Sequence, residues 1–358
     1  MLRYLVIAIL SFFSLNIVAE SDTIPHKQSF AGKVWNGVKG VLREFNNIDT
    51  TYIEPQRYKF TTTLMSTYSF EQYNISSKSG QEVTFSPEAR FVVGPYLGWS
   101  FLFLGYTFDL GYISTGKEKQ VNLSVYTSML GVDFFLKRAG KDYKIRSWDN
   151  GVGEEVDLEG VPFDGLSVSI TGLNAYYIFN HHKFSYPAAF SQSTCQRKSA
   201  GSFMLGAGYT RHSLELDHQK LQTALNNAMP DMTEKIDSGL MFNDIKYTDI
   251  SFSGGYGYNW VFSRNWLLSM SLSAAIGYKH SAGNRVKDLL TLKDFSFSNI
   301  NFDGVGRFGV IWNNSKWYFG SFAVIHSYNY KKPQFKTNNF FGNVYVYVGV
   351  NFGRKKNK

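Results

Sequence analysis

The chain has 358 residues, and 37 Lys and Arg against 28 Asp and Glu give it a formal net charge of +9 at pH 7. Aromatic residues make up 17% and charged residues only 18%, whereas an ordinary soluble domain carries roughly 25% charge. The mean hydropathy is −0.21, and beyond residue 20 no apolar run approaches the ~20 residues that a membrane-spanning helix needs. These values exclude a polytopic helical membrane protein and leave the transmembrane β-barrel as the open membrane class.

The first residues are typical of a targeting segment. The basic Arg3 precedes the apolar stretch 4–13, and Ile17 and Ala19 occupy the positions expected before a cleavage site. This arrangement predicts a secretory signal peptide over residues 1–19, cleaved after Ala19, with an uncleaved anchor helix as the alternative. Secretion argues against nucleic acid as the partner of the basic charge. We expect phosphorylated lipid headgroups instead.

Residues 20–57 are predicted to form a periplasmic extension. Val34, Val38 and Leu42 recur at helical spacing, which favours a short amphipathic helix across Phe30–Phe45. We interpret it as a loosely packed linker helix, and the alternative is a helix that covers the barrel mouth or rests on the membrane surface.

From Tyr58 onward the hydrophobic period changes to two. In Tyr58–Phe70, Phe60 and Leu64 fall on one face and Lys59 and Thr61 on the other. Alternate side chains of a strand point to opposite sides, so one face suits lipid and the other a polar interior. Aromatic residues gather near the strand ends, as interfacial girdles require. The pattern predicts an all-β fold, an antiparallel transmembrane β-barrel.

We predict about twelve strands, within a range of ten to fourteen, over residues 58–353, followed by a basic tail at 354–358. If the first strand runs outward, the short connections at 263–264 and 313–315 fall on the periplasmic side and the longer ones outside. One long connection, 215–245, is predicted to hold a short helix ended by Pro230. The predicted strands are 58–73, 83–97, 100–113, 121–137, 142–149, 163–180, 200–214, 246–262, 265–281, 295–312, 316–331 and 339–352.

Two stretches of the chain resemble a known family. Asp49–Glu54, with the sequence Asp-Thr-Thr-Tyr-Ile-Glu, leads into the first strand, and Phe184–Gln192 is followed by Gln196–Phe203. Together they resemble an uncharacterised outer-membrane protein family, defined as a domain of unknown function and common in Bacteroidota-type bacteria. The resemblance implies an outer-membrane barrel and implies no activity.

The segment Asn180–Lys198 falls on the periplasmic side and is too long for a turn. Irregular backbone of this kind finds hydrogen-bond partners when it folds into a barrel mouth. We favour a plug that fills a narrow lumen, and the alternative is a gate or partner-docking element. Its Cys195, the sole cysteine, has Arg197 and Lys198 nearby, and such cations lower a thiol pKa. Since no His or acid lies close in sequence, an incidental thiol is favoured.

Three His-Ser pairs, which begin at His212, His280 and His326, suggest a lipid hydrolase that uses Ser and His on barrel strands. Adjacent strand residues face opposite sides, so a base within the same strand must lie two residues from its serine. A pair formed across two strands stays open, with His212 as the candidate base because strand parity directs it to the lumen. The pair His181-His182 has no ligand-spaced partner, so we predict no metal site and no cofactor.

Charged residues on the inward-facing positions carry both signs in similar numbers. We favour ion pairs that fill a closed barrel, because buried charges must be paired. The alternative is a charged constriction that selects solutes. The predicted lumen charges are Lys59, Glu71, Glu88, Arg90, Asp109, Asp133, Asp249, Lys279, Asp303 and Arg307.

The favoured function is a non-enzymatic outer-membrane protein, either a narrow channel or a structural and partner-binding barrel. The alternative is a lipid-modifying hydrolase. The expected partners are outer-membrane lipid or lipopolysaccharide, the barrel-insertion machinery and a periplasmic or envelope protein, with no nucleic acid. Val350 and Phe352 in the last strand resemble the terminal apolar and aromatic pair that the insertion machinery recognises.

Overall fold

A computed structural model describes residues 47–99, 102–105, 108–109, 119–138, 142–153, 155–230, 235–242, 244–281, 299–331 and 335–355. The predicted signal peptide and the helix predicted for Phe30–Phe45 lie outside these residues. The chain divides into two units after Asn46, and the description below concerns the second unit. No helix among the described residues is long and apolar enough to cross a bilayer.

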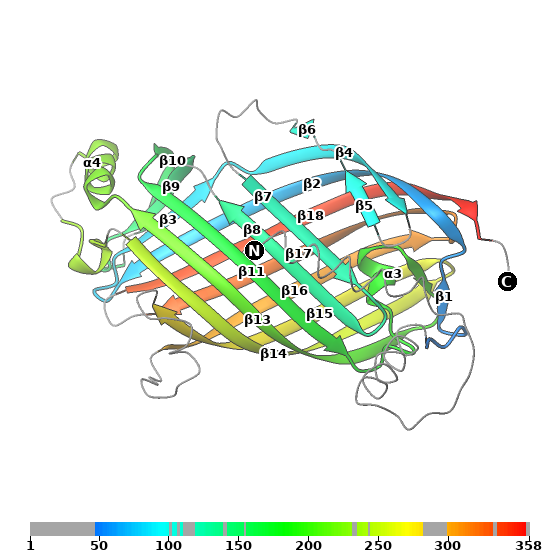
Figure 1. Cartoon of the computed structure of the whole chain (residues 1–358). Helices are drawn as coiled ribbons and strands as arrows, with labels where there is room; N and C mark the ends of the chain where they lie inside the picture. Colours follow the sequence, from blue (N-terminus) through cyan, green and yellow to red (C-terminus); the bar gives the residue numbers. More distant parts are fainter. Residues whose placement is uncertain are drawn as a thin grey trace, which may run out of the picture. The chain divides into compact units, whose positions relative to one another are not determined.

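The protein is all-β and antiparallel, as predicted, and a sheet of sixteen strands dominates the described residues (Figure 1). The long strands of the sheet are β2 (Tyr58–Ser77), β4 (Arg90–Trp99), β8 (Leu130–Arg138), β11 (Leu166–Ile178), β13 (Ala200–Leu216), β14 (Asp244–Ser263), β15 (Trp266–Ser281), β16 (Ile300–Asn313), β17 (Trp317–Lys331) and β18 (Phe335–Arg354). The shorter strands are β3 (Glu82–Pro87), β5 (Leu102–Gly105), β6 (Phe108–Asp109), β7 (Lys119–Tyr126), β9 (Tyr143–Asp149) and β10 (Glu155–Phe163).

The sheet has more strands than predicted because three predicted strands are each divided in two and one strand was missed. The predicted strand 121–137 is the hairpin β7–β8, which turns where Thr127 bonds to Leu130. The stretch 83–97 is β3 and β4, and 100–113 holds β5 and β6. Strand β10 was not predicted. The strand predicted at 142–149 exists as β9, but it pairs with β3 and β10 and not with its expected neighbours.

Thirteen strands of the sheet follow the order β10-β9-β3-β2-β18-β17-β16-β15-β14-β13-β11-β8-β7. Strand β2 pairs along one edge with β18, and along the other with β4 over its first half and β3 over its second half. Strands β5 and β6 then pair with β4. The β3–β9–β10 group is therefore a branch from β2, and the remaining strands form the wall.

The wall curls around its own enclosed face. On β14, Tyr247, Asp249 and Asn259 are buried, whereas the intervening Phe252 and Trp260 point outward and are exposed. Strands far apart in the sheet order also meet across the enclosed side. The β16 residue Arg307 contacts the β8 residue Asp133 at 2.5 Å, although β15, β14, β13 and β11 separate those two strands. Such a contact requires a strongly curved sheet.

Two groups of short elements mark the two ends of the wall (Figure 1). At the end that we call the α3 end lie the helix α3 (Tyr186–Phe190) and a small sheet in which β1 (Ile53–Pro55) pairs with β12 (Thr194–Gln196). At the other end, the α4 end, lie the β3–β9–β10 branch, helix α4 (His218–Ala228) and the 3₁₀ turn η1 (Ser238–Leu240). The tight β14–β15 and β16–β17 turns lie at the α3 end.

Helix α4 follows directly from its sequence. Asp217 caps it by accepting hydrogen bonds from the backbone N–H groups of Gln219 and Lys220. Leu221 and Leu225, four residues apart, share one face and are fully buried in the apolar cluster of the α4 end. The helix ends before Pro230, as predicted.

We expect Leu221→Ala to loosen α4, because the truncation leaves a cavity in that cluster and costs about 2–5 kcal/mol. Protease cleavage within 215–245 should become faster while the wall keeps its resistance to denaturing detergent. The exposed Thr223→Ala change on the same helix is the control. Equal cleavage rates in the two variants would contradict the packing role.

Candidate functional site

The candidate site is the enclosed face of the wall, together with the segment 180–198 that lies against it, which we call the plug. Helix α3 is the centre of the plug, and its five residues are all buried. Ser185 begins the helix by accepting a hydrogen bond from the backbone N–H of Ala188, and Pro187 suits its first turn. This short helix places the ring of Tyr186 among the side chains of the wall.

A buried ion pair crosses the enclosed face beside Tyr186. Asp133 accepts hydrogen bonds from Arg307 at 2.5 Å, from Ser124 at 2.6 Å and from the Tyr126 hydroxyl at 3.1 Å. The centre of the Arg307 guanidinium group lies 5.4 Å from the Tyr176 ring and 5.9 Å from the Tyr186 ring. The carboxylate and the rings together compensate a charge that would otherwise be costly to bury.

The space that remains beside this ion pair is small. A cavity of about 40 Å³ lies between the plug and the wall, bordered by Tyr186, Arg307, Asp303 and Asn174. That volume holds only a few water molecules. In the described part of the chain, the enclosed face at this level is thus filled by side chains.

Hydrogen bonds join the plug to several wall strands. The Asn259 side chain on β14 donates to the Ser185 carbonyl at 2.8 Å and to the Gln196 side chain at 3.0 Å. Gln192 donates to the Tyr347 hydroxyl on β18 at 2.8 Å. The Tyr186 hydroxyl lies 2.6 Å from Ser271 Oγ on β15. The plug is therefore bonded to three strands of the wall, β14, β15 and β18.

Glu54 anchors the outer side of the plug. Its carboxylate accepts hydrogen bonds from Arg197 and from Ser315, and Arg57 pairs with it at 2.9 Å. Burial pushes the pKa of Glu54 upward, but the hydrogen bonds and the two guanidinium charges outweigh burial and hold that pKa below its usual value. Glu54 is therefore an ionised anchor at neutral pH.

Cys195 is buried next to this anchor, with its sulfur 3.6 Å from Ser315 Oγ. Burial raises the pKa of the thiol, despite the opposing effect of Arg197. Arg197 lowers this pKa, as expected of a neighbouring cation, but desolvation is the larger effect and the net shift is upward. Cys195 has the properties of a structural thiol.

A second buried charge cluster lies on β14, β15 and β16. Lys279 Nζ donates to Asp303 Oδ1 at 3.0 Å and to the Asn329 carbonyl. Asp249 is the register partner of Lys279 and is 1% exposed, yet neither of its carboxyl oxygens has a hydrogen-bond partner among the described residues. The same holds for Asp303 Oδ2 within this part of the chain. One lysine thus serves two carboxyl groups.

His212 is buried in an aromatic stack. Its Nε2 lies 2.7 Å from the Tyr73 hydroxyl, and its ring stacks on Tyr247 at 4.8 Å, which in turn stacks on Tyr330 at 4.2 Å. Among the described residues, Tyr73 is its hydrogen-bond partner, and no serine hydroxyl is bonded to it. His326 lies in a separate aromatic cluster with Phe341, and the side chain of His280 is outside the described residues.

The structure brings six of the ten predicted lumen charges into buried positions: Glu71, Asp133, Asp249, Lys279, Asp303 and Arg307. Glu71 is paired with Lys137, a residue that sequence reasoning missed. Lys59 and Glu88 are exposed, and Glu88 pairs with Lys144. Arg90 is half-buried, and the side chain of Asp109 lies outside the described residues.

No group of three or more potential metal ligands exists among the described residues. His181 and His182 lie near backbone carbonyls, with Nδ1 at 3.0 Å from Ile178 O and at 2.7 Å from Asn47 O respectively. Sequence reasoning also missed Tyr186 as the central side chain of the plug. The three aromatic residues within Phe184–Phe190 were the sequence feature that could have indicated this packing role.

We expect Glu54→Gln to loosen the plug, with the rate of Cys195 modification as the measurement. At pH 7 a disulfide reagent active in acid should modify this buried thiol several-fold faster in the variant. Because the folded pKa of Glu54 is lowered, its stabilisation is complete above the ordinary pKa of 4.5 and is lost as pH falls through the folded value. The wild-type rate should therefore approach that of the variant in acid. Equal rates at pH 7 would contradict the anchor role.

We expect Asp249→Asn to raise the urea midpoint of unfolding by the equivalent of about 1–3 kcal/mol, because the amide can donate to Asp303 and an unpartnered buried carboxylate disappears. Asp133→Asn is the matched comparison. It leaves Arg307 without its carboxylate and should cost about 3–5 kcal/mol. A loss of stability in both variants would contradict this expectation and would show that the Asp249 carboxylate stabilises Lys279 as an ion-pair partner.

Comparisons with known proteins come from structures and from a family model. No curated protein matches this chain. Similar solved structures include the outer-membrane protease OmpT from Escherichia coli, with 8% identity over 82% of this chain and 97% of that one and a TM-score of 0.36. The translocator domain of the autotransporter NalP from Neisseria meningitidis has 11% identity over 90% of this chain and 96% of that domain, with a TM-score of 0.31. The β domain of the Bordetella autotransporter BrkA has 11% identity over 82% of this chain and 99% of that domain, with a TM-score of 0.33.

These structural similarities assign no residue role to this chain. The family model, by contrast, matches residues 47–352, which include both the plug and the wall. The chain therefore belongs to the family described as Domain of unknown function (DUF4421).

Proposed function

We propose that this protein is a β-barrel of a bacterial outer membrane, of the Bacteroidota type that the sequence resemblance suggests, and that its interior is closed at rest. It acts without catalysis, as a structural and partner-binding barrel of the envelope. The predicted signal peptide 1–19 supports export, and the terminal Phe352 supports recognition by the insertion machinery.

The outward face of the wall supports the membrane location. Large apolar side chains there are exposed on many neighbouring strands, among them Phe203 on β13, Phe252 on β14, Leu272 on β15 and Phe302 on β16. A continuous apolar surface of this kind requires a nonpolar medium or a partner. The alternation of this surface with buried polar residues on the same strands is typical of barrels in lipid.

The main support for a closed interior is the Arg307–Asp133 ion pair, which packs against Tyr186 of the plug. It joins opposite sides of the enclosed face, and only about 40 Å³ remains beside it. A hydrated ion needs a continuous wide path, and among the described residues the ion pair and the Tyr186 ring occupy this level of the enclosed face. The narrow channel would require the plug to move out.

The hydrolase alternative has less support. His212 is bonded to Tyr73 and is covered by Tyr247, so a lipid ester has no route to its ring nitrogen. A catalytic base needs both a nucleophile within reach and access to substrate.

Single-channel conductance in a planar bilayer tests the proposal. We expect no steady current from the intact protein, because the ion pair and the plug fill the enclosed face. A variant that lacks 180–198 should conduct, because the deletion removes the plug from the enclosed face. A variant that lacks 218–228 at the α4 end is the control and should stay silent. Steady conductance of the intact protein would overturn the closed state.

A further inference from the structure

Two tight turns at the α3 end enclose a pocket that the proposed function does not use. The turn between Ser263 and Trp266 joins β14 to β15, and the turn between Asn313 and Trp317 joins β16 to β17. A pocket of about 570 Å³ lies against both turns and the plug. Its lining includes Glu54 and Arg197, together with Phe262 and with Arg264, Asn265 and Asn314 of the two turns.

Arg197 of the plug connects the two turns. It donates to Asn265 Oδ1 at 2.7 Å in the first turn and to Ser315 Oγ at 3.2 Å in the second, and Glu54 holds its Nε at 2.7 Å. Asn265 and Ser315 have φ values of +67° and +76°, a conformation that non-glycine residues seldom adopt. Such strain persists only where surrounding contacts hold it, and it is frequent at functional sites.

The free hydrogen-bond donors of the pocket favour an anion. Arg264, which lines the pocket from the first turn, is exposed and has no ion pair among the described residues. Lys316, which follows the lining residue Asn314 in the second turn, is likewise exposed and without an ion pair among those residues. Asn314 uses its Oδ1 to accept from the backbone N–H groups of Lys316 and Trp317, so its remaining side-chain group is a donor. The carboxylate of Glu54 is already compensated by Arg57 and Arg197.

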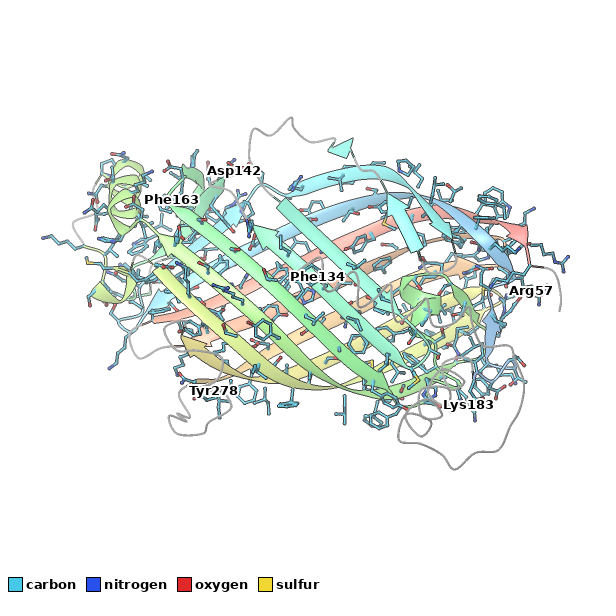
Figure 2. The ribbon with its side chains drawn as sticks, in the orientation of Figure 1. Arg57, Phe134, Asp142, Phe163, Lys183 and Tyr278 are labelled. Atoms are coloured by element: carbon cyan, nitrogen blue, oxygen red, sulfur yellow. The ribbon has the colours of Figure 1, made fainter. Side chains whose placement is uncertain are left out.

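The pocket lies at the basic end of the molecule. Figure 2 labels Arg57 and Lys183 at the α3 end and Phe163 at the opposite end. The carboxylates at the α3 end in the described residues are Asp49 and Glu54, whereas the cations there are Arg57, Lys59, Lys183, Arg197, Lys198, Arg264, Lys316, Arg354 and Lys355. Elsewhere in the described residues acidic side chains slightly outnumber basic ones, so the positive charge is concentrated at this end.

An aromatic belt adjoins these cations on the outward face. The rings of Trp260, Phe262, Trp266 and Phe319 follow one another, with centroid distances of 5.6, 6.0 and 5.7 Å. Phe262 belongs both to this belt and to the pocket lining. A ligand that satisfies both surfaces carries an anionic head for Arg264 and an apolar tail for the belt.

We propose that this pocket binds the phosphate headgroup of an anionic glycerophospholipid, with the acyl chains lying along the belt. The assignment rests on the membrane location in the proposed function. A phosphate accepts charge-assisted hydrogen bonds from a guanidinium and from amide donors, and aromatic rings mark the depth at which headgroups lie.

Native mass spectrometry of the full chain in neutral detergent tests the proposal, with phosphatidylglycerol and phosphatidylcholine as probes. We expect preferential retention of phosphatidylglycerol. Arg264→Gln should weaken it about tenfold, since a charged hydrogen bond is lost, and Lys316→Gln should weaken it to a smaller extent. Lys336→Gln is the matched control, because it removes an exposed cation at the α4 end and should change nothing.

Equal losses in Arg264→Gln and Lys336→Gln would overturn the site, because retention would then follow net charge alone. Complete displacement of the lipid by glycerol 3-phosphate or inorganic phosphate at matched concentration would overturn the lipid assignment in favour of free phosphate. Insertion into phosphatidylcholine bilayers separates this test from the proposed function. A chain that does not insert contradicts the membrane location, whereas one that inserts without lipid preference contradicts only the pocket assignment.

Discussion

Ionised groups enclosed by a curved sheet have no access to bulk water, so each one needs a partner inside the sheet. In this protein that requirement joins β16 to β8 through Arg307 and Asp133, across the enclosed face. One carboxylate does not fully compensate the cost of burying the guanidinium group. The rings of Tyr176 and Tyr186 add cation–π contacts that lower this cost further. Since Tyr186 comes from the plug, the same interaction fixes where the plug lies.

The outward face, in contrast, requires nonpolar surroundings. Its side chains are apolar and exposed on the strands that carry the buried charges, so no second layer of this chain covers them in the described residues. The proposed bilayer would satisfy that face, and the ladders between neighbouring strands satisfy most of the backbone within it. The proposed membrane location and the proposed closed interior are thus two consequences of one alternating pattern.

The strands could be predicted to the extent that their signals are local. Period-two alternation located β13 to β18 to within a few residues, but it continues without a break through 121–137, and the turn at Thr127 therefore went unseen. Buried charges were likewise visible on single strands. Their pairing was not, because Arg307 and Asp133 are 174 residues apart and meet only through the curl and order of the sheet. The missed partner Lys137 belongs to the same hidden hairpin.

Arg197 links the interior to the outer surface of the α3 end. Its guanidinium holds the strained turns at Asn265 and Ser315, and Glu54 fixes it in place. Gln192 and Gln196, which precede it in the chain, bond to the wall. A ligand that binds the two turns more tightly in this arrangement than in another favours the closed position of the plug, because binding to one of two states shifts the equilibrium toward it. In that case opening of the plug weakens the ligand reciprocally, and the proposed lipid pocket and the proposed closed interior are coupled through Arg197.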